Sequence, residues 1–217
     1  MNDGGETEVH FRADRATMHS MTESASRSLR DRQLAETARR LRAEARRLTA
    51  ERGLAGFTVE EVCSEVGVSR RTFFNYFAAK ENAVLGIPAR ADTSDLDEAF
   101  LASEGELLES LAELHIARWE RLDMSPAEVP ALVAAFTKAP QLVQHLLDLA
   151  ALGEREDTAL VARREGWSED DERAATAVQL VGALLRPTVS EYFAGTGDDF
   201  RSLLLRRLAL ARRLFSA

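Results

Sequence analysis

The stretch TVEEVCSEVGVSRRTFFNYF, residues 58–77, holds two short helical patterns separated by a glycine. Thr58 followed three residues later by Glu61 is a capping box, which predicts the start of a helix. Gly67 ends that helix, because glycine tolerates the left-handed backbone of a tight turn. Ser69 can then cap a second helix. The stretch therefore predicts two helices joined by a tight turn, over residues 59–66 and 70–76.

This spacing is typical of a helix-turn-helix, whose second helix enters the major groove of DNA. The unit needs a small side chain where its helices come closest, and Cys63, four residues before Gly67, is small. We expect the contacts between the helices from Val62, Val66, Val68 and Phe73. The exposed face of the second helix then carries hydrogen-bonding side chains: Ser69, Arg70, Arg71, Thr72 and Asn75. A plain helical hairpin with a glycine turn is the alternative, and the full set of spacings favours DNA binding.

Residues 51–82, ERGLAGFTVEEVCSEVGVSRRTFFNYFAAKEN, resemble the N-terminal domain of the TetR family of transcriptional regulators. The matching elements are Glu51-Arg52-Gly53, Thr58-Val59, Gly67-Val68-Ser69, Tyr76-Phe77 and Lys80. The resemblance implies a DNA-binding domain followed by a C-terminal helical domain that holds an effector and forms a homodimer. Beyond this region the chain is similar to the family only in the number and length of its helices.

The resemblance also implies roles for single residues. It assigns contacts with phosphates to Thr58, Tyr76 and Lys80. It assigns contacts with bases to Arg70, Arg71 and Thr72, and arginine can bond guanine through two hydrogen bonds. Each phosphate residue has an alternative: Thr58 as a helix cap only, Tyr76 as a packing residue, and Lys80 as a solvated lysine. A cation in the first turn of a helix opposes the helix dipole, which favours a specific reason for Lys80.

Helical patterns extend through the rest of the chain, and no segment has the alternation of a strand. A stripe of Leu34, Ala38, Leu41, Ala45 and Leu48 predicts a first helix over 29–52, stopped by Gly53. Lys80 begins a fourth helix, which Pro88 limits. Residues 88–103 are predicted as a linker with at most a turn of helix. Further helices are expected over 104–122, 126–136, 139–164, 169–194 and 198–215.

The predicted fold is all-α, with an N-terminal three-helix helix-turn-helix domain joined to a C-terminal helical bundle domain with dimerisation helices. The predicted divisions are a flexible tail, a DNA-binding domain, and a ligand-binding and dimerisation domain, over residues 1–26, 27–80 and 81–217. The charge follows these divisions: the net charge of −8 is made up of −3, +5 and −10 in that order. A basic segment beside an acidic body is expected where one part alone contacts phosphate.

Two strongly apolar segments near the C-terminus, residues 174–194 and 200–215, are predicted to form a dimer interface. Two helices from each subunit would make a four-helix interface. The residues expected there are Val178, Val181, Leu185, Val189, Leu204, Leu208 and Leu214. Burial of the same residues within one subunit is the alternative.

A pocket for a small-molecule effector is a further hypothesis for the C-terminal domain. Apolar and polar side chains mix on its middle helices, and the candidate liners are His115, Trp119, Phe136, His145 and Leu149. Ordinary core or surface positions are the alternative for each of them. The sequence does not indicate the chemical class of the effector.

Enzymatic function is not expected, because the chain has no HExxH pattern, no nucleophile elbow, no phosphate-binding glycine loop and no CxxC pair. The single cysteine excludes an internal disulfide, and neither a metal nor a cofactor is predicted. No apolar run is long enough for a membrane span, so we expect a cytoplasmic protein. The predicted function is a dimeric regulator, in most cases of this kind a repressor, released from a palindromic operator by its effector. An activator and a helical adaptor remain as alternatives.

Overall fold

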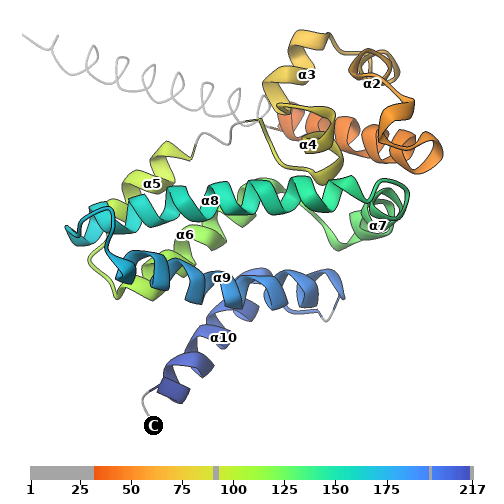
Figure 1. Ribbon diagram of the computed structural model, residues 1–217. Coiled ribbons are helices and arrows are strands. Elements are labelled where there is room, and N and C mark those ends of the chain that lie inside the picture. Colours follow the sequence, from red (N-terminus) through yellow and green to blue (C-terminus); the bar gives the residue numbers. More distant parts are fainter. Residues whose placement is uncertain (1–31, 90–92, 196, 216–217) are drawn as a thin grey trace, which may run out of the picture. The chain divides into compact units, whose positions relative to one another are not determined.

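A computed structural model describes residues 32–89, 93–195 and 197–215 of the chain. All regular elements within these ranges are helices, which confirms the all-α prediction (Figure 1). The tail predicted over 1–26 lies outside the described residues. Among the described helices, none is long and apolar enough to cross a membrane.

Residues 1–40 and 41–217 form two units, and each is described by itself. In the first unit, residues 32–40 are helical. The hydroxyl of Thr37 donates to the carbonyl of Gln33 at 2.8 Å, and Arg39 pairs with Glu36 at 3.4 Å. Both contacts join residues one turn apart, as expected on the surface of a helix.

The second unit begins with helical residues 41–52 and continues through short helices to a bundle of longer ones. Its further elements are η1 (Leu54–Gly56), α2 (Val59–Val66), α3 (Arg70–Tyr76), α4 (Lys80–Leu85), α5 (Ser94–Leu101), α6 (Leu107–Leu122), η2 (Pro126–Glu128), α7 (Val129–Lys138), α8 (Gln141–Glu165), α9 (Glu172–Phe193) and α10 (Phe200–Phe215).

Most helices lie where the sequence predicts them, and the main difference falls in the expected linker. Two turns of helix, α5, replace the single turn predicted within 88–103. The reason is tertiary, because α5 has no side-chain cap and instead buries Phe100 in the core. Helix α8 runs without interruption through Gly153, and α9 continues through Pro187.

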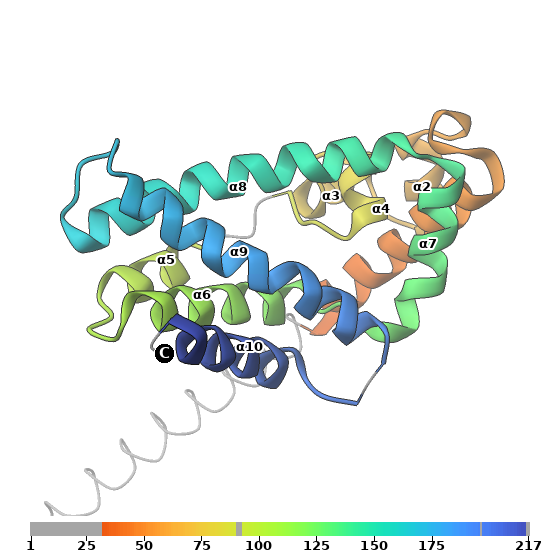
Figure 2. The same cartoon turned by 60° about the horizontal axis from the view of Figure 1, so that its bottom comes forward.

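Helices α8 and α9 lie side by side in opposite directions beside α6 and form the centre of the bundle (Figures 1 and 2). Gly166 ends α8 in the left-handed conformation, with φ of 67°. Asp171, rather than Ser168 as the sequence suggests, caps α9 by accepting a hydrogen bond from the backbone of Arg173. The side chain and backbone of Arg173 lower the pKa of Asp171 to about 2.

The core of the bundle has two parts that share α6. The first joins α5, α6, α8 and α9 through Phe100, Leu111, Leu114, Leu160, Val161, Ala162, Ala174, Val178 and Val181. The second joins α6 and α10 through Ala112, Ile116, Phe200, Leu204 and Leu208. These lists contain four residues that the sequence assigns to a dimer interface.

Those four residues, Val178, Val181, Leu204 and Leu208, are buried inside their own chain. For them the alternative of burial within one subunit is correct, because at most 4% of each side chain remains exposed to meet a partner. Leu185 and Val189 are partly buried against the second core, and only Leu214 is fully accessible. The apolar faces were therefore recognised, but most of them face inward.

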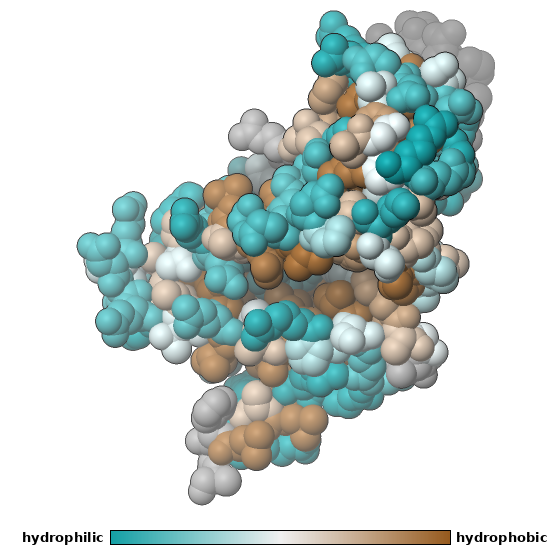
Figure 3. Space-filling model, turned by 45° about the vertical axis from the view of Figure 1, so that its right-hand side comes forward, coloured by the Kyte–Doolittle hydropathy of each residue, from teal (hydrophilic) through white to brown (hydrophobic). Residues whose placement is uncertain are grey.

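The first half of α8 departs from this close packing. Leu142 is buried, and the next buried residue along the helix is Asp157. Large apolar side chains between them are exposed, with Leu146 at 40% and Leu152 at 52%. Figure 3 shows a hollow with apolar walls between α8 and α9. The two helices thus pack at one end of their hairpin and leave space at the other.

We predict that Leu111→Ala lowers the free energy of unfolding by about 2–5 kcal/mol, because the fully buried side chain leaves a cavity in the core. Denaturant unfolding followed by circular dichroism measures this loss. Leu147→Ala is the matched control: its side chain is 57% exposed on α8, and we expect a change within about 0.5 kcal/mol. Equal losses in the two variants would contradict the assignment of the core.

Candidate nucleic-acid interface

The capping box predicted at Thr58 is present at the start of α2. The Thr58 hydroxyl accepts a hydrogen bond from the backbone N–H of Glu61 at 3.2 Å. In return the Glu61 carboxylate accepts one from the backbone N–H of Thr58 at 2.7 Å. This backbone contact is the main reason that the pKa of Glu61 lies below its ordinary value. Thr58 therefore acts as a helix cap, whatever else its hydroxyl contacts.

The turn between α2 and α3 has the left-handed backbone that the sequence predicts. Gly67 has φ of 77°, and its N–H donates to the carbonyl of Cys63 at 2.9 Å. Ser69 caps α3 by accepting from the backbone N–H of Thr72 at 3.0 Å, and the two hydroxyls lie 2.8 Å apart. The beginning of α3 is thereby fixed by side chains that are themselves candidates for contact with DNA.

The residues expected to hold α2 against α3 are buried. Val62 and Phe73 are fully buried, Cys63 and Val66 nearly so, and Val68 is half-buried. The ring of Phe73 also contacts the ring of Phe77, with centroids 5.9 Å apart. Burial raises the pKa of the Cys63 thiol, so this cysteine serves as a small packing residue rather than a nucleophile.

Lys80 ties the start of α4 to the segment before α2. Its ammonium donates to the carbonyl of Phe57 at 3.0 Å and lies over the ring of Phe57, 5.0 Å from the centroid. An ammonium has three N–H donors, so this contact leaves donors for a phosphate. The specific reason that the sequence indicated for a lysine here thus includes a contact within the domain.

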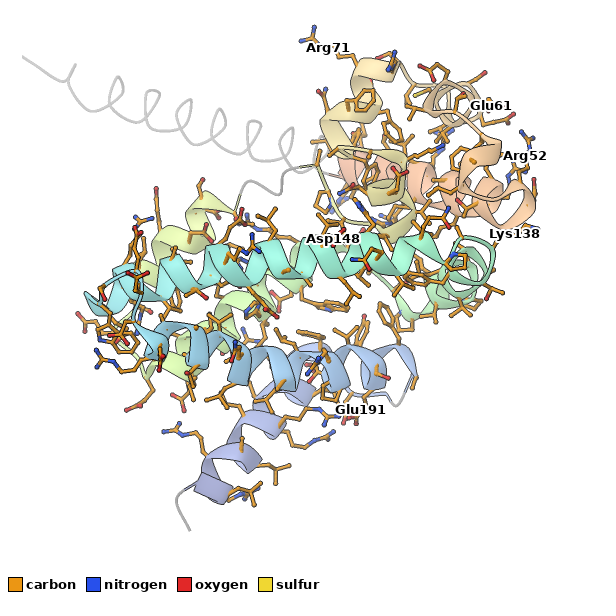
Figure 4. All side chains as sticks on the ribbon, viewed as in Figure 1. Arg52, Glu61, Arg71, Lys138, Asp148 and Glu191 are labelled. Atoms are coloured by element: carbon orange, nitrogen blue, oxygen red, sulfur yellow. The ribbon has the colours of Figure 1, made fainter. Side chains whose placement is uncertain are left out.

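The remaining predicted residues form the accessible face of α3. Arg71 and Asn75 are exposed, and Figure 4 shows the Arg71 side chain extending away from the helix. Arg70 is also exposed, and its Nε lies 3.2 Å from a carboxylate oxygen of Glu60 on α2. Tyr76 is half-buried beside Phe77, with ring centroids 6.4 Å apart. A row of donors therefore faces solvent along a helix whose other side is buried.

The pair between Arg70 and Glu60 is a feature that the sequence analysis does not predict. The two residues are ten positions apart and belong to different helices, so helical spacing gives no signal for their contact. The guanidinium of Arg70 also lies over the ring of Phe74, 5.4 Å from its centroid. Both contacts hold Arg70 at the surface in a limited range of orientations.

The candidate effector residues do not gather in one site. His115 lies 3.4 Å from the buried carboxylate of Asp157, which also accepts from Arg118 at 2.6 Å. Burial lowers the pKa of His115. His145 contacts the amide of Asn82 on α4 at 3.1 Å. Trp119 stacks on another ring of the bundle, Phe136 and Leu149 are half-buried, and none of these five residues contacts another in the described contacts.

Two clefts open on the bundle. One of about 740 Å³ lies among α5, α6 and α10 and contains none of the candidate effector residues. The other, of about 520 Å³, lies beside α6 and the end of α9 and includes Trp119. Trp119 stacks on Phe200 there, with centroids 4.3 Å apart and planes inclined by 9°. Among the described residues, no cluster of His, Cys, Asp and Glu could hold a metal ion.

We predict that Thr58→Ala lowers the free energy of unfolding by about 1 kcal/mol, because the first turn of α2 loses its cap. Thr58→Ser keeps the hydroxyl and should retain nearly all of the stability of the natural chain. Thermal unfolding of both variants compares them. A Thr58→Ala variant as stable as Thr58→Ser would contradict the capping role.

The geometry agrees with the sequence relationships of the chain. The sequence profile of the family described as "Bacterial regulatory proteins, tetR family" matches residues 41–85, which contain α2, α3 and α4. The HTH-type transcriptional regulator TcmR of Streptomyces glaucescens is 28% identical over 190 residues, which cover 81% of each chain. These relationships extend from the helix-turn-helix into the helical C-terminal region. The chain belongs to the TetR family of bacterial regulatory proteins and is a DNA-binding transcriptional regulator rather than an enzyme.

Proposed function

We propose that the chain represses transcription as a homodimer bound to a palindromic operator, and that a small-molecule effector releases it. The observation that carries this proposal is the row of exposed donors on α3, set on a helix whose opposite side is buried. A helix presented in this way can enter the major groove, and its N-terminal residues then reach the base edges. Occupation of the operator would block RNA polymerase.

Base contacts are proposed for Arg70, Arg71, Thr72 and Asn75. Arg71 extends into solvent, where its guanidinium can bond the two acceptors of a guanine. The contact with Glu60 uses Nε of Arg70, and a guanidinium has further N–H donors for a base. The sequence specificity of the protein would therefore depend mainly on these two arginines.

Phosphate contacts are proposed for Thr58, Ser69, Tyr76 and Lys80, which flank the base-contacting row. The net charge of +5 over residues 27–80 supports this placement, since the remainder of the chain is acidic. The acidic body would be repelled by the duplex, so electrostatics favours binding through α2 and α3. Because a bacterial chromosome lies in the cytoplasm, we also propose a cytoplasmic location.

The homodimer is proposed to form through surfaces of α9 and α10 that remain accessible. Leu180 on α9 is 39% exposed, and Leu210 and Leu214 on α10 are 48% and 80% exposed. Leu210 and Leu214 lie one turn apart and so share a face of α10. An isologous interface of these helices would bury apolar surface twice, once from each subunit. Leu214 is the one residue of the originally predicted interface that this surface retains.

The effector is proposed to bind in the apolar hollow beside α8. Helix α8 has no buried residue between Leu142 and Asp157, and Figure 3 shows apolar side chains on the walls of the hollow. His145 would couple occupancy to the DNA-binding domain, because it contacts Asn82 on α4 at 3.1 Å. An effector that favours a different position of α4 would lower operator affinity by the difference of its two binding free energies.

We predict that replacing Arg70 and Arg71 together by alanine weakens operator binding by at least about 100-fold, because each bidentate base contact contributes roughly 1–3 kcal/mol. The probe is a duplex selected by the natural chain from a random-sequence library, and fluorescence anisotropy measures its affinity. The dependence of affinity on salt should also become shallower.

The matched control replaces Arg155 and Arg163, two exposed arginines of α8, by alanine. This variant removes the same charge from the acidic body and should bind the duplex as the natural chain does. Equal affinity of the two double variants would contradict the role of Arg70 and Arg71.

We predict that Leu210→Asp combined with Leu214→Asp converts the dimer to a monomer, because four carboxylates would meet at the interface. Sedimentation velocity measures the oligomeric state, and affinity for the selected duplex should fall by about 100-fold as the two half-sites lose their linkage. The control places the same charges at Val143 and Leu147, exposed one turn apart on α8. A dimeric Leu210→Asp, Leu214→Asp variant would show that another surface joins the subunits.

A further inference from the structure

Two arginines of the helix over residues 32–52 are buried. Arg42 is 3% exposed and Arg46 is 1% exposed, and they lie one turn apart. Burying a guanidinium is costly unless it is paired and hydrogen-bonded. The groups that receive these two side chains therefore show what holds the helix in place.

A single carboxylate receives both arginines. One oxygen of Glu128, at the end of η2, accepts from Nε of Arg42 at 3.1 Å and from Nη1 of Arg46 at 2.5 Å. The other oxygen accepts from Nη2 of Arg42 at 3.1 Å. Burial raises the pKa of Glu128, but Arg42 and Arg46 together bring it below its ordinary value. We call Arg42, Arg46 and Glu128 the arginine clamp.

Backbone carbonyls complete the clamp and connect it to two more segments. Arg42 also donates to the carbonyl of Asp123 at 3.0 Å, just after α6. Arg46 donates to the carbonyl of Val84 in α4 at 2.7 Å. The clamp thus joins the first helix of the DNA-binding domain, α4, and the segment between α6 and α7.

The segment between α6 and α7 is held from its other side by the bundle. The hydroxyl of Tyr192, on α9, donates to the carbonyl of Met124 at 3.3 Å. The ring of Tyr192 packs edge-on against Trp119 and Phe200, with centroids 5.4 and 6.2 Å away. A short chain of contacts therefore leads from the DNA-binding domain through Glu128 and Met124 to α9 and α10.

The clamp also leaves little room for movement around it. A Cβ atom added at Gly86, the residue that ends α4 with φ of 81°, would lie 3.0 Å from Cδ of Arg42 and 3.2 Å from Nη2 of Arg46. The planar guanidinium of arginine fixes the directions of its hydrogen bonds more strictly than an ammonium does. The position of the helix is thereby defined in direction as well as in distance.

We propose that Arg42, Arg46 and Glu128 are positioning residues for operator binding, which set the spacing between the two recognition helices of the dimer. This inference rests on the proposed dimeric function. Because α9 and α10 would join the subunits, whatever fixes each DNA-binding domain relative to these helices also fixes the distance between the two copies of α3. One base pair of spacing turns a half-site by about 35° and moves it by about 3.4 Å, so a small displacement of the domain misaligns it.

The test compares duplexes of different half-site spacing. The parent duplex is the one that the natural chain selects from a random-sequence library, and two base pairs are inserted at or removed from its centre. We expect the natural chain to lose at least about tenfold in affinity for either altered duplex. Glu128→Gln should bind the parent duplex about tenfold more weakly and distinguish the three duplexes by less than about threefold, because its DNA-binding domains are no longer held in one position.

Glu165→Gln is the matched control, since the Glu165 side chain is 26% exposed against 21% for Glu128 and also pairs with a buried arginine, Arg164. A merely structural role of Glu128 would lower stability as this control does, without changing the spacing preference. Arg42→Lys, which keeps the charge but loses the planar fork, is the second variant and carries the test if Glu128→Gln does not fold. A natural spacing preference in whichever variant is folded would overturn the positioning role alone. Failure of the natural chain to select any duplex would overturn the proposed function, and the positioning role with it.

Discussion

The DNA-binding face exists because two helices that are too short to form alone are held by caps and by buried contacts. Helices α2 and α3 span eight and seven residues, and isolated helices of fewer than about 12–15 residues are marginal in water. The Thr58 and Ser69 caps satisfy N–H groups that would otherwise lack partners. Burial of Phe73 then supplies the stabilisation that length cannot. The recognition surface is thus a product of the packing beneath it.

The sequence predicts this part of the chain well because its signals are local. Caps and glycines act on the residues next to them, so the bounds 59–66 and 70–76 agree with α2 and α3. Signals are weaker where tertiary packing decides. Helix α5 has no side-chain cap to announce it, and the burial of Phe100 stabilises a segment that resembles a linker. Predictability therefore falls as the stabilising contacts become more distant along the chain.

The dimer prediction shows a second limit of the same kind. Periodicity identifies the apolar face of a helix, but a subunit core and a subunit interface have similar composition. Val178 and Val181 satisfy the pattern by packing in their own chain. The side chains left for a partner, such as Leu210, stand on the opposite side of helices whose inward face was mistaken for the interface. Only the exposed fraction of each side chain separates these two destinations.

Arg42 and Arg46 were beyond the reach of the sequence for a related reason. They flank the stripe of Leu41, Ala45 and Leu48, where a solvated charge is the ordinary expectation, and a second wall of the protein covers them. That wall uses a carboxylate although a pair of apolar surfaces would contribute as much stability, since desolvation offsets most of the gain from a buried ion pair. Nη2 of Arg46 even finds no hydrogen-bond partner among the described residues, a further cost. Apolar surfaces can slide past one another at little cost, whereas three hydrogen bonds to one carboxylate cannot all survive a shift of the helix. A contact that adds little stability but fixes a direction is expected where the function depends on geometry, and binding to two half-sites of a rigid duplex depends on it.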